Sequence, residues 1–332
     1  MQHIFSYVEQ LDLAAQQLKH VDDPAYGRFA LILTDNLIEL MLHKRCKDEM
    51  WMENLWLTMG KPRYTTKERE DVLGRYFAPK VKFVRKLGLI SQAEQGFILT
   101  CHDYRNELYH TGVQHDDIIY AIAWQHHSFA CEFLKRQDAK SWSSGLRISD
   151  AVRRHGFDGK YALGAAFKKQ LESGANSLSA GKPVRTESLS ATLSKSLIAR
   201  LELTQNSLDF LIKENPNSLN EFQLIEYLQR QRQQLGSAAR YEALLYIQEG
   251  QPSLEQRLEA VRSSWVPKYD ENPIPKWIKR AHSIGAEVEP ITALQRHEQI
   301  QNEMRSFTML IEDAAVYLDS YFMYLSDVAR GK

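Results

Sequence analysis

The sequence predicts an all-α protein: an N-terminal helical bundle followed by a second helical domain with a long C-terminal helix. Apolar residues recur at helical spacing almost throughout, as in Phe29, Leu33 and Leu37. Runs that alternate β-branched and polar residues, which are typical of strands, are missing. Helix-breaking residues divide the chain into segments of about 10 to 30 residues. These breakers are Asp22-Asp23-Pro24, Gly60-Lys61-Pro62, Ala78-Pro79, Gly112, Gly145, Asn215-Pro216, Gly250 to Pro252 and Asn272-Pro273.

Length and composition favour two soluble domains. At roughly 150 residues per domain, the 332 residues correspond to about two units. Hydrophobic residues make up 43% of the chain and charged residues 25%, which excludes global disorder. The net charge of zero excludes a whole-molecule attraction to nucleic acid or membrane. We expect a helical domain over residues 1–138, a basic connecting segment or linker over 139–186, and a C-terminal helical domain of unassigned role over 187–332.

Cysteine usage and hydropathy favour a cytoplasmic location for the protein. Cys46, Cys101 and Cys131 stand far apart without a C-x-x-C pair, which argues against a disulfide framework and a thiolate zinc site. The longest uncharged run, residues 118–131, is too short and too polar to cross a bilayer. The N-terminal segment carries acidic residues before its first lysine and lacks the form of a secretory signal. We therefore expect a cytoplasmic protein without a membrane partner.

The chemically most informative segment is residues 91–112, SQAEQGFILTCHDYRNELYHTG. Ser91 can cap a helix there, Glu94 stands three residues on as in a capping box, and Gly112 can end the helix. The hexapeptide RNELYH, residues 105–110, lies near the C-terminal end. At about 100° per residue, Asn106 and His110 lie one turn apart on nearly the same face. The long Arg105 side chain can swing toward that face.

These residue types suit RNA cleavage by the 2′-hydroxyl group. His110 can accept the hydroxyl proton or protonate the departing oxygen. Arg105 supplies a permanent planar charge for the phosphoryl oxygens, and Asn106 can orient the imidazole or the phosphate. This chemistry requires no metal and no other cofactor.

The arrangement resembles the HEPN superfamily, whose signature is R-x(4–6)-H, with a polar residue directly after the arginine, near the end of a helix in a small bundle. RNELYH matches the shortest form and has the favoured asparagine. The resemblance covers residues 24–136 and implies that Arg105, Asn106 and His110 are the catalytic residues of a metal-independent endoribonuclease. In one branch of the superfamily the motif continues His-x-Tyr, and that tyrosine is a site of regulation. Gly112 stands at the tyrosine position here, so regulation through that position is not expected.

The resemblance also implies partners. Members commonly dimerise with the motif helices of two subunits facing each other, and many act as toxins or anti-phage effectors. We therefore expect an RNA substrate, a homodimer with the site at its interface, and an antitoxin or other regulatory partner. One motif supplies a single arginine and a single histidine, whereas the reaction needs a base, an acid and charge stabilisation. Two facing motifs would complete this set.

Other interpretations of these residues stay open. His102 precedes Arg105 by one helical turn and, with Tyr109, could line the edge of the same cleft. Five histidines fall between positions 102 and 127, but their spacing matches no tight metal-ligand pattern. Arg105 could instead pair with Glu107 or another acid while His110 caps the helix end. A HEPN domain that binds RNA without cutting it is a further alternative.

A basic stretch follows the motif. Residues 139–200 contain eleven Lys and Arg but only four Asp and Glu. A solvated face is the plain explanation, and an RNA contact surface is the functional one. The candidate RNA contacts are Arg147, Arg153, Arg154, Lys160, Lys168 and Lys169. Residues 148–171 also outline two short helices across a glycine turn, so a helix-turn-helix DNA-binding regulator and a purely structural interaction protein are rival functions.

The remaining segments concern architecture. Residues 173–191, rich in Ser, Gly and Ala, predict a linker or long loop. Residues 291–328 carry a seven-residue apolar pattern, which predicts a packed seam. An antiparallel partner in the same bundle, such as residues 189–211, is favoured over an intermolecular coiled coil. The seam residues are Met304, Ile311, Leu318 and Leu325 at one position, and Phe307, Ala314, Tyr321 and Val328 at the other.

Overall fold

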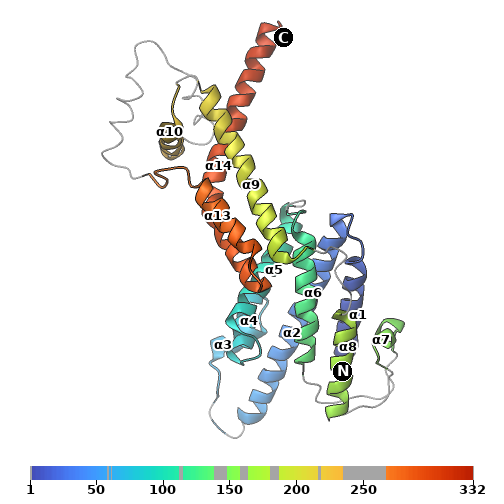
Figure 1. Ribbon diagram of the computed structural model, residues 1–332. Coiled ribbons are helices and arrows are strands. Elements are labelled where there is room, and N and C mark those ends of the chain that lie inside the picture. Colours follow the sequence, from blue (N-terminus) through green and yellow to red (C-terminus); the bar gives the residue numbers. More distant parts are fainter. Residues whose placement is uncertain are drawn as a thin grey trace. The chain divides into compact units, whose positions relative to one another are not determined.

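The computed structural model describes residues 2–57, 60, 62–111, 115–137, 148–157, 164–179, 187–215, 218–234 and 267–331 (Figure 1). Every regular element within these ranges is a helix, and no strand occurs in them, which confirms the all-α class. The expected long C-terminal helix is α14, Pro290–Ala329. None of the helices in the described ranges combines the length and apolar character needed to traverse a bilayer.

The chain folds into two compact units. Unit 1 comprises Met1–Thr192 together with Val288–Gln295, and unit 2 comprises Leu193–Glu287 together with Arg296–Lys332. Helix α9 (Leu189–Glu214) and helix α14 therefore have residues in both units.

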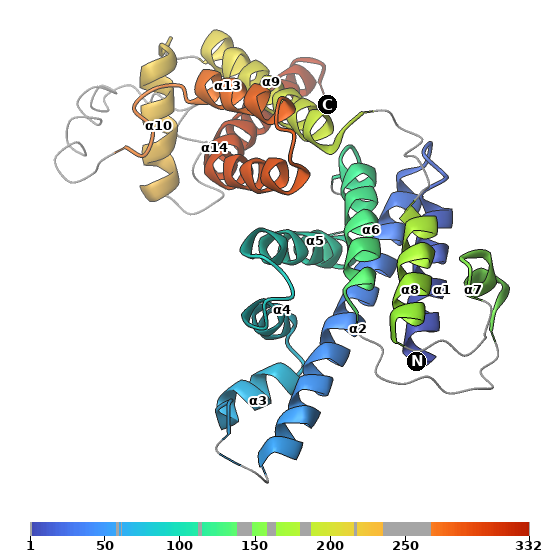
Figure 2. The ribbon, with the colours of Figure 1, turned by 60° about the horizontal axis from the view of Figure 1, so that its bottom comes forward.

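Unit 1 is built around the long helix α2. Helices α1 and α6 pack along α2, and α8 packs on α1 and α6 (Figures 1 and 2). α2 can serve as this centre because buried apolar residues such as Leu31, Ile38 and Leu42 recur along it at helical spacing. The helices of unit 1 besides α9 and α14 are α1 (Gln2–Gln17), α2 (Pro24–Leu57), α3 (Thr66–Leu73), α4 (Phe77–Lys86), α5 (Gln92–Thr111), α6 (Ile119–Lys135), α7 (Asp150–Arg154) and α8 (Gly164–Ser179).

Polar contacts fasten α6 to α1. The Tyr120 hydroxyl donates to the carbonyl oxygen of Leu18 at 2.6 Å, and His127 Nε2 lies 3.1 Å from the carbonyl oxygen of Leu11. Burial lowers the pKa of His127 to about 4, because desolvation disfavours the charged imidazole. His127 is therefore a neutral residue of the core.

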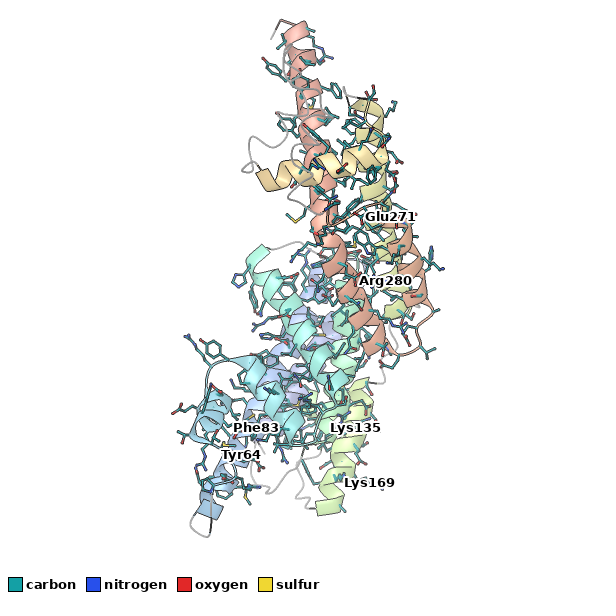
Figure 3. All side chains as sticks on the ribbon, turned by 90° about the vertical axis from the view of Figure 1, so that its left-hand side faces the viewer. Tyr64, Phe83, Lys135, Lys169, Glu271 and Arg280 are labelled. Carbon is teal, nitrogen blue, oxygen red and sulfur yellow. The ribbon has the colours of Figure 1, made fainter. Side chains whose placement is uncertain are left out.

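Helices α3 and α4 also pack on α2. The buried ammonium of Lys80 donates to the carbonyl oxygens of Gly74 at 2.5 Å and Tyr76 at 2.9 Å, which holds the turn between the two helices. Tyr64 meets Phe83 edge to face, with ring centres 5.1 Å apart, and Figure 3 shows both side chains in one region. These contacts fix α4, which also packs on α5.

The prediction of a linker over residues 173–191 is wrong for its first part. Residues 173–179 belong to α8, whose apolar face is buried. A Cβ added at Gly174 would lie 2.4 Å from the ring of Phe157, so only glycine lets the helix approach this closely. Small residues suit such close packing as well as a linker, and composition does not separate the two. Residues 180–186 lie outside the described ranges.

Helices α7 and α8 belong to unit 1, although they fall within the expected connecting segment 139–186. The Asp12 carboxylate on α1 accepts hydrogen bonds from Arg154 Nη2 at 2.6 Å and from His155 Nε2 at 2.8 Å. His155 Nδ1 lies 3.0 Å from Ser177 Oγ on α8. These hydrogen bonds hold the end of α7 against α1 and α8, so the described parts of the segment pack on the bundle.

Unit 2 contains the remaining parts of α9 and α14 together with α10 (Glu221–Gln234) and α13 (Ile274–Gly285). Helix α13 runs antiparallel to α9, because Asn272 before its start donates to Gln205 while Gly285 at its end packs against Ser194. α13 is also antiparallel to α14, since Arg280 pairs with Glu303 and the chain reverses between the two helices (Figure 1). α9 and α14 are therefore parallel.

The predicted antiparallel pairing of residues 189–211 with the seam is accordingly wrong, because α13 takes the antiparallel position. The seam itself is buried through Met304, Phe307, Ile311, Ala314 and Leu318. Beyond Leu318 it is open: Leu325 is 43% exposed and Val328 52% exposed.

The three cysteines are buried and form no disulfide: Cys46 on α2, Cys101 on α5 and Cys131 on α6. Burial raises the pKa of the Cys46 and Cys131 thiols to about 12. Neither is a thiolate at neutral pH, so both behave as small core residues.

Candidate active site

Helix α5 carries the RNELYH hexapeptide, and its start is the predicted capping box. Ser91 Oγ accepts from the backbone N–H of Glu94 at 3.1 Å, and the Glu94 carboxylate accepts from that of Ser91 at 2.7 Å. Arg136 pairs with the same carboxylate at 2.7 Å and ties α5 to the end of α6. The predicted stop at Gly112 lies outside the described ranges.

Five polar side chains form one stripe on α5. They stand at positions i, i+3, i+4, i+7 and i+8, which share one side of a helix. They are His102, Arg105, Asn106, Tyr109 and His110. Tyr104, on the opposite side of the helix, is buried. The three predicted catalytic residues and the two predicted cleft-edge residues thus lie on one face.

A buried carboxylate on α2 anchors this stripe. The Asp35 side chain is fully buried, and its Oδ2 lies 2.9 Å from His102 Nδ1 and 3.5 Å from Arg105 Nε. His126 from α6 is also fully buried and places Nε2 3.8 Å from Asp35 Oδ1, beyond hydrogen-bond distance. Burial alone would raise the pKa of Asp35, but the neighbouring His102 and His126 lower it to about 2. The carboxylate is therefore ionised.

Asp35 is the residue that sequence reasoning missed. Its signal is an acid at a core position, since Leu31, Ile38 and Leu42 at −4, +3 and +7 are fully buried. An ionised side chain on such a face needs a partner of opposite charge or a hydrogen-bond donor. That partner comes from α5 and α6, which are far from Asp35 in sequence.

Arg105 is held within the stripe, and one edge of its guanidinium is left without a hydrogen bond to the described part of the chain. Its Nη1 donates to Asn106 Oδ1 at 2.9 Å, and its Cζ lies 4.9 Å from the ring centre of Tyr109. Its side chain is 22% exposed, and Nη2 makes no hydrogen bond to a described residue, so this edge can receive an anion. Glu107, the alternative partner for Arg105, is paired with His115 Nε2 at 2.9 Å instead.

The two stripe histidines differ in how they are held. The His102 ring stacks on Phe77, with 4.1 Å between ring centres and 25° between the planes. His110 is exposed, lies one turn beyond Asn106, and makes no hydrogen bond, ion pair or ring contact with a described residue. The Asp35 cluster thus gathers His102 and Arg105, while Asn106 and His110 extend the stripe beyond it.

The candidate RNA contacts fall into three groups. Lys168 and Lys169 on α8 and Arg153 on α7 are exposed. Arg154 is engaged by the α1 carboxylate described above. Arg147 and Lys160 lie outside the described ranges.

The stripe offers proton-transfer groups and a fixed positive charge side by side, which are the elements of acid–base chemistry at a phosphate. In the described part of the chain, no group of three or more His, Cys, Asp or Glu side chains is placed to hold a metal ion. Comparison with known proteins gives no match to a protein-family model, a curated protein or a solved structure.

The depressed pKa of Asp35 predicts an acid-labile fold. A carboxyl with a folded pKa of about 2 and an unfolded pKa of about 3.9 contributes stability that is complete above the unfolded value. That contribution, roughly 2–3 kcal/mol, diminishes as the pH falls from about 4 to about 2. Urea titrations across this window should therefore show a steeper acid loss of unfolding free energy in the native protein than in Asp35→Asn. Parallel pH dependences would contradict the assignment.

Proposed function

We propose that this protein is a metal-independent endoribonuclease that cleaves RNA by attack of the 2′-hydroxyl on the adjacent phosphate. The observation that carries the proposal is the polar stripe on α5, where Arg105, Asn106 and His110 share a face. The ionised Asp35 beside Arg105 and the open Nη2 edge add support, because they orient a permanent cation toward solvent.

In the proposed reaction the 2′-oxygen forms a bond to phosphorus while the bond to the 5′-oxygen breaks. One histidine takes the 2′-hydroxyl proton, and another gives a proton to the departing 5′-oxygen. Arg105 stabilises the additional negative charge on the phosphoryl oxygens, and Asn106 holds Arg105 through Nη1. The products carry a 2′,3′-cyclic phosphate and a 5′-hydroxyl.

The direct test incubates purified protein with total RNA and with tRNA in EDTA, beside His110→Ala. We expect cleavage by the native protein, 2′,3′-cyclic phosphate and 5′-hydroxyl ends, and loss of cleavage in the variant. Products with 3′-hydroxyl and 5′-phosphate ends, or cleavage abolished by EDTA, would contradict the mechanism. Operator DNA binding without cleavage would favour a regulator instead.

The exposed cations of α7 and α8 are proposed to follow the RNA backbone. Replacing Arg153, Lys168 and Lys169 together by Gln should weaken RNA binding and flatten its salt dependence. Removing one cation that neutralises a phosphate reduces the slope of log K against log salt by about 0.7 for single strands, so the total change is about 2. The matched control replaces the exposed Lys213, Lys276 and Lys279 of unit 2. An equal effect in both triple variants would mean that the α7–α8 charges are merely solvated.

We propose that two subunits of a two-fold symmetric dimer share each active site. His110 stands eight residues after His102, about 12 Å along the helix, so the two flank a single phosphate poorly within one chain. A facing partner helix would bring a second set of groups alongside. Specific activity should therefore fall on dilution near the dimer dissociation constant, with mass measured at matched concentrations. Full activity in a preparation shown to be monomeric would exclude the shared site.

The resemblance extends the proposal to growth arrest or anti-phage defence, with an antitoxin or other regulatory partner and a cytoplasmic location. Expression of the native chain in bacteria should then arrest growth, and expression of His110→Ala at equal level should not. Arrest by both chains would separate toxicity from ribonuclease activity.

A further inference from the structure

We infer that His102, oriented by Asp35, is the general base that accepts the 2′-hydroxyl proton, with His110 of the facing subunit of the proposed dimer acting as the acid. This inference rests on the proposed function and assigns the division of labour within that site. The hexapeptide alone would give the base role to His110, and it contains neither His102 nor Asp35.

Asp35 determines the tautomer of His102. Nδ1 lies 2.9 Å from the Asp35 carboxylate, which is buried and can only accept a hydrogen bond. The proton of the neutral ring therefore sits on Nδ1, and Nε2 carries the lone pair. A base oriented in this way by a buried carboxylate is the arrangement used in hydrolytic triads.

Ring stacking fixes the orientation of the His102 imidazole. Phe77 at the start of α4 stacks on it at 4.1 Å, so the imidazole plane is fixed from a third helix. The His102 side chain remains 16% exposed, and no described residue bonds to Nε2. The surrounding titratable and charged groups are Asp35 from α2, His126 from α6 and Arg105 from α5 itself; from α4 the ring meets the uncharged Phe77.

The two histidines differ in the partners that orient them. His110 has no orienting partner among the described residues, whereas His102 has two. Arg105 stands three residues after His102, where side chains on a helix are neighbours, so the base and the phosphate-binding cation lie side by side. His110 is exposed on the same stripe and takes the remaining role, that of the acid.

The group formed by Asp35, His102, Arg105 and His126 differs from a purely structural cluster. Several of its buried atoms have no hydrogen-bond partner among the described residues, namely Asp35 Oδ1, Arg105 Nε and both ring nitrogens of His126. A cluster retained only for stability is expected to satisfy its buried polar atoms. A buried polar atom without a partner calls for an explanation, and a catalytic role is one such explanation.

The experiment measures kcat/KM against pH, in EDTA, for the native protein, His102→Gln, Asp35→Asn and the control His282→Gln, an exposed histidine of unit 2. We expect His102→Gln to lose at least about 100-fold and the ascending limb of the profile, with unchanged RNA binding. Asp35→Asn should lose activity while keeping the ring, because the tautomer is no longer fixed. His282→Gln should match the native protein.

A second substrate identifies which histidine is the base. In an RNA with sulfur in place of the scissile 5′-oxygen, the leaving thiolate needs no proton. His110→Ala should then regain activity while His102→Gln stays impaired. Recovery of His102→Gln on this substrate would overturn the base assignment.

Rescue by added imidazole distinguishes loss of the catalytic base from loss of folding. Added imidazole should restore part of the activity of a His102→Ala variant, whereas an unfolded variant gains none, and absence of rescue in a folded variant overturns the inference. Native cleavage with full activity in His102→Gln overturns this inference alone. Absence of cleavage by the native protein overturns the proposed function as well.

Discussion

Arg105→Ala should reduce kcat for RNA cleavage by about 10²–10³-fold, which corresponds to about 2.7–4 kcal/mol of transition-state stabilisation. The reason is that the guanidinium is already aimed, through Asp35 and Asn106, before the phosphate gains charge. RNA affinity should change much less, since the exposed cations of α7 and α8 remain. Single-turnover cleavage and filter binding on the same RNA separate the two effects.

Arg105→Lys should also cleave RNA slowly. The lysine ammonium is a point charge and lacks the planar array of donors that lets a guanidinium bind Asn106 and a phosphate oxygen together. The matched control is Arg85→Ala, which removes an arginine from the last turn of α4. Full activity in either Arg105 variant would remove Arg105 from the site.

Phe307→Ala should destabilise unit 2 by about 3–5 kcal/mol, as expected for emptying a large aromatic site in a core. The Phe307 side chain is fully buried and meets the rings of Tyr269 and Trp277 edge-on, with centres 5.0 and 5.8 Å away. The substitution removes both aromatic pairs and leaves a void in the seam. Urea unfolding of the full chain should show the destabilisation as a lower midpoint.

The control for this variant is Val316→Ala on the same helix, where the side chain is 66% exposed. Its effect should stay within about 0.5 kcal/mol, as for ordinary surface substitutions. Equal destabilisation by the two variants would mean that helix propensity, and not the aromatic core, determines the stability of unit 2.

The local features of α5 could be predicted from sequence. Its capping box depends on Ser91 and Glu94, which are three residues apart, and its polar stripe depends on helical spacing alone. The buried seam of α14 follows from the same periodicity as far as Leu318. Each of these features is local in sequence, so a single helix geometry suffices to place the residues.

The features that escaped prediction depend on tertiary packing. Asp35 became part of the site only when α5 and α6 packed on α2, which brings residues 67 positions apart to 2.9 Å. Gly174, Ala175 and Leu178 are buried because α8 packs on α1 and α6, with Phe157 against Gly174. The parallel course of α9 and α14 required knowledge of where α13 lies.

The three buried thiols give this protein a built-in set of reporters. Each of the helices that supply Asp35, His102 and His126 carries one of them, namely Cys46, Cys101 and Cys131. A thiol reagent can reach a buried sulfur only when its helix opens, so the labelling rate measures the free energy of that opening. Mass spectrometry of labelled peptides would thus compare the local opening of α2, α5 and α6 in the native chain, without any added probe. RNA bound at the proposed site should lower the labelling rates of all three cysteines. The largest decrease is expected at Cys101 on α5.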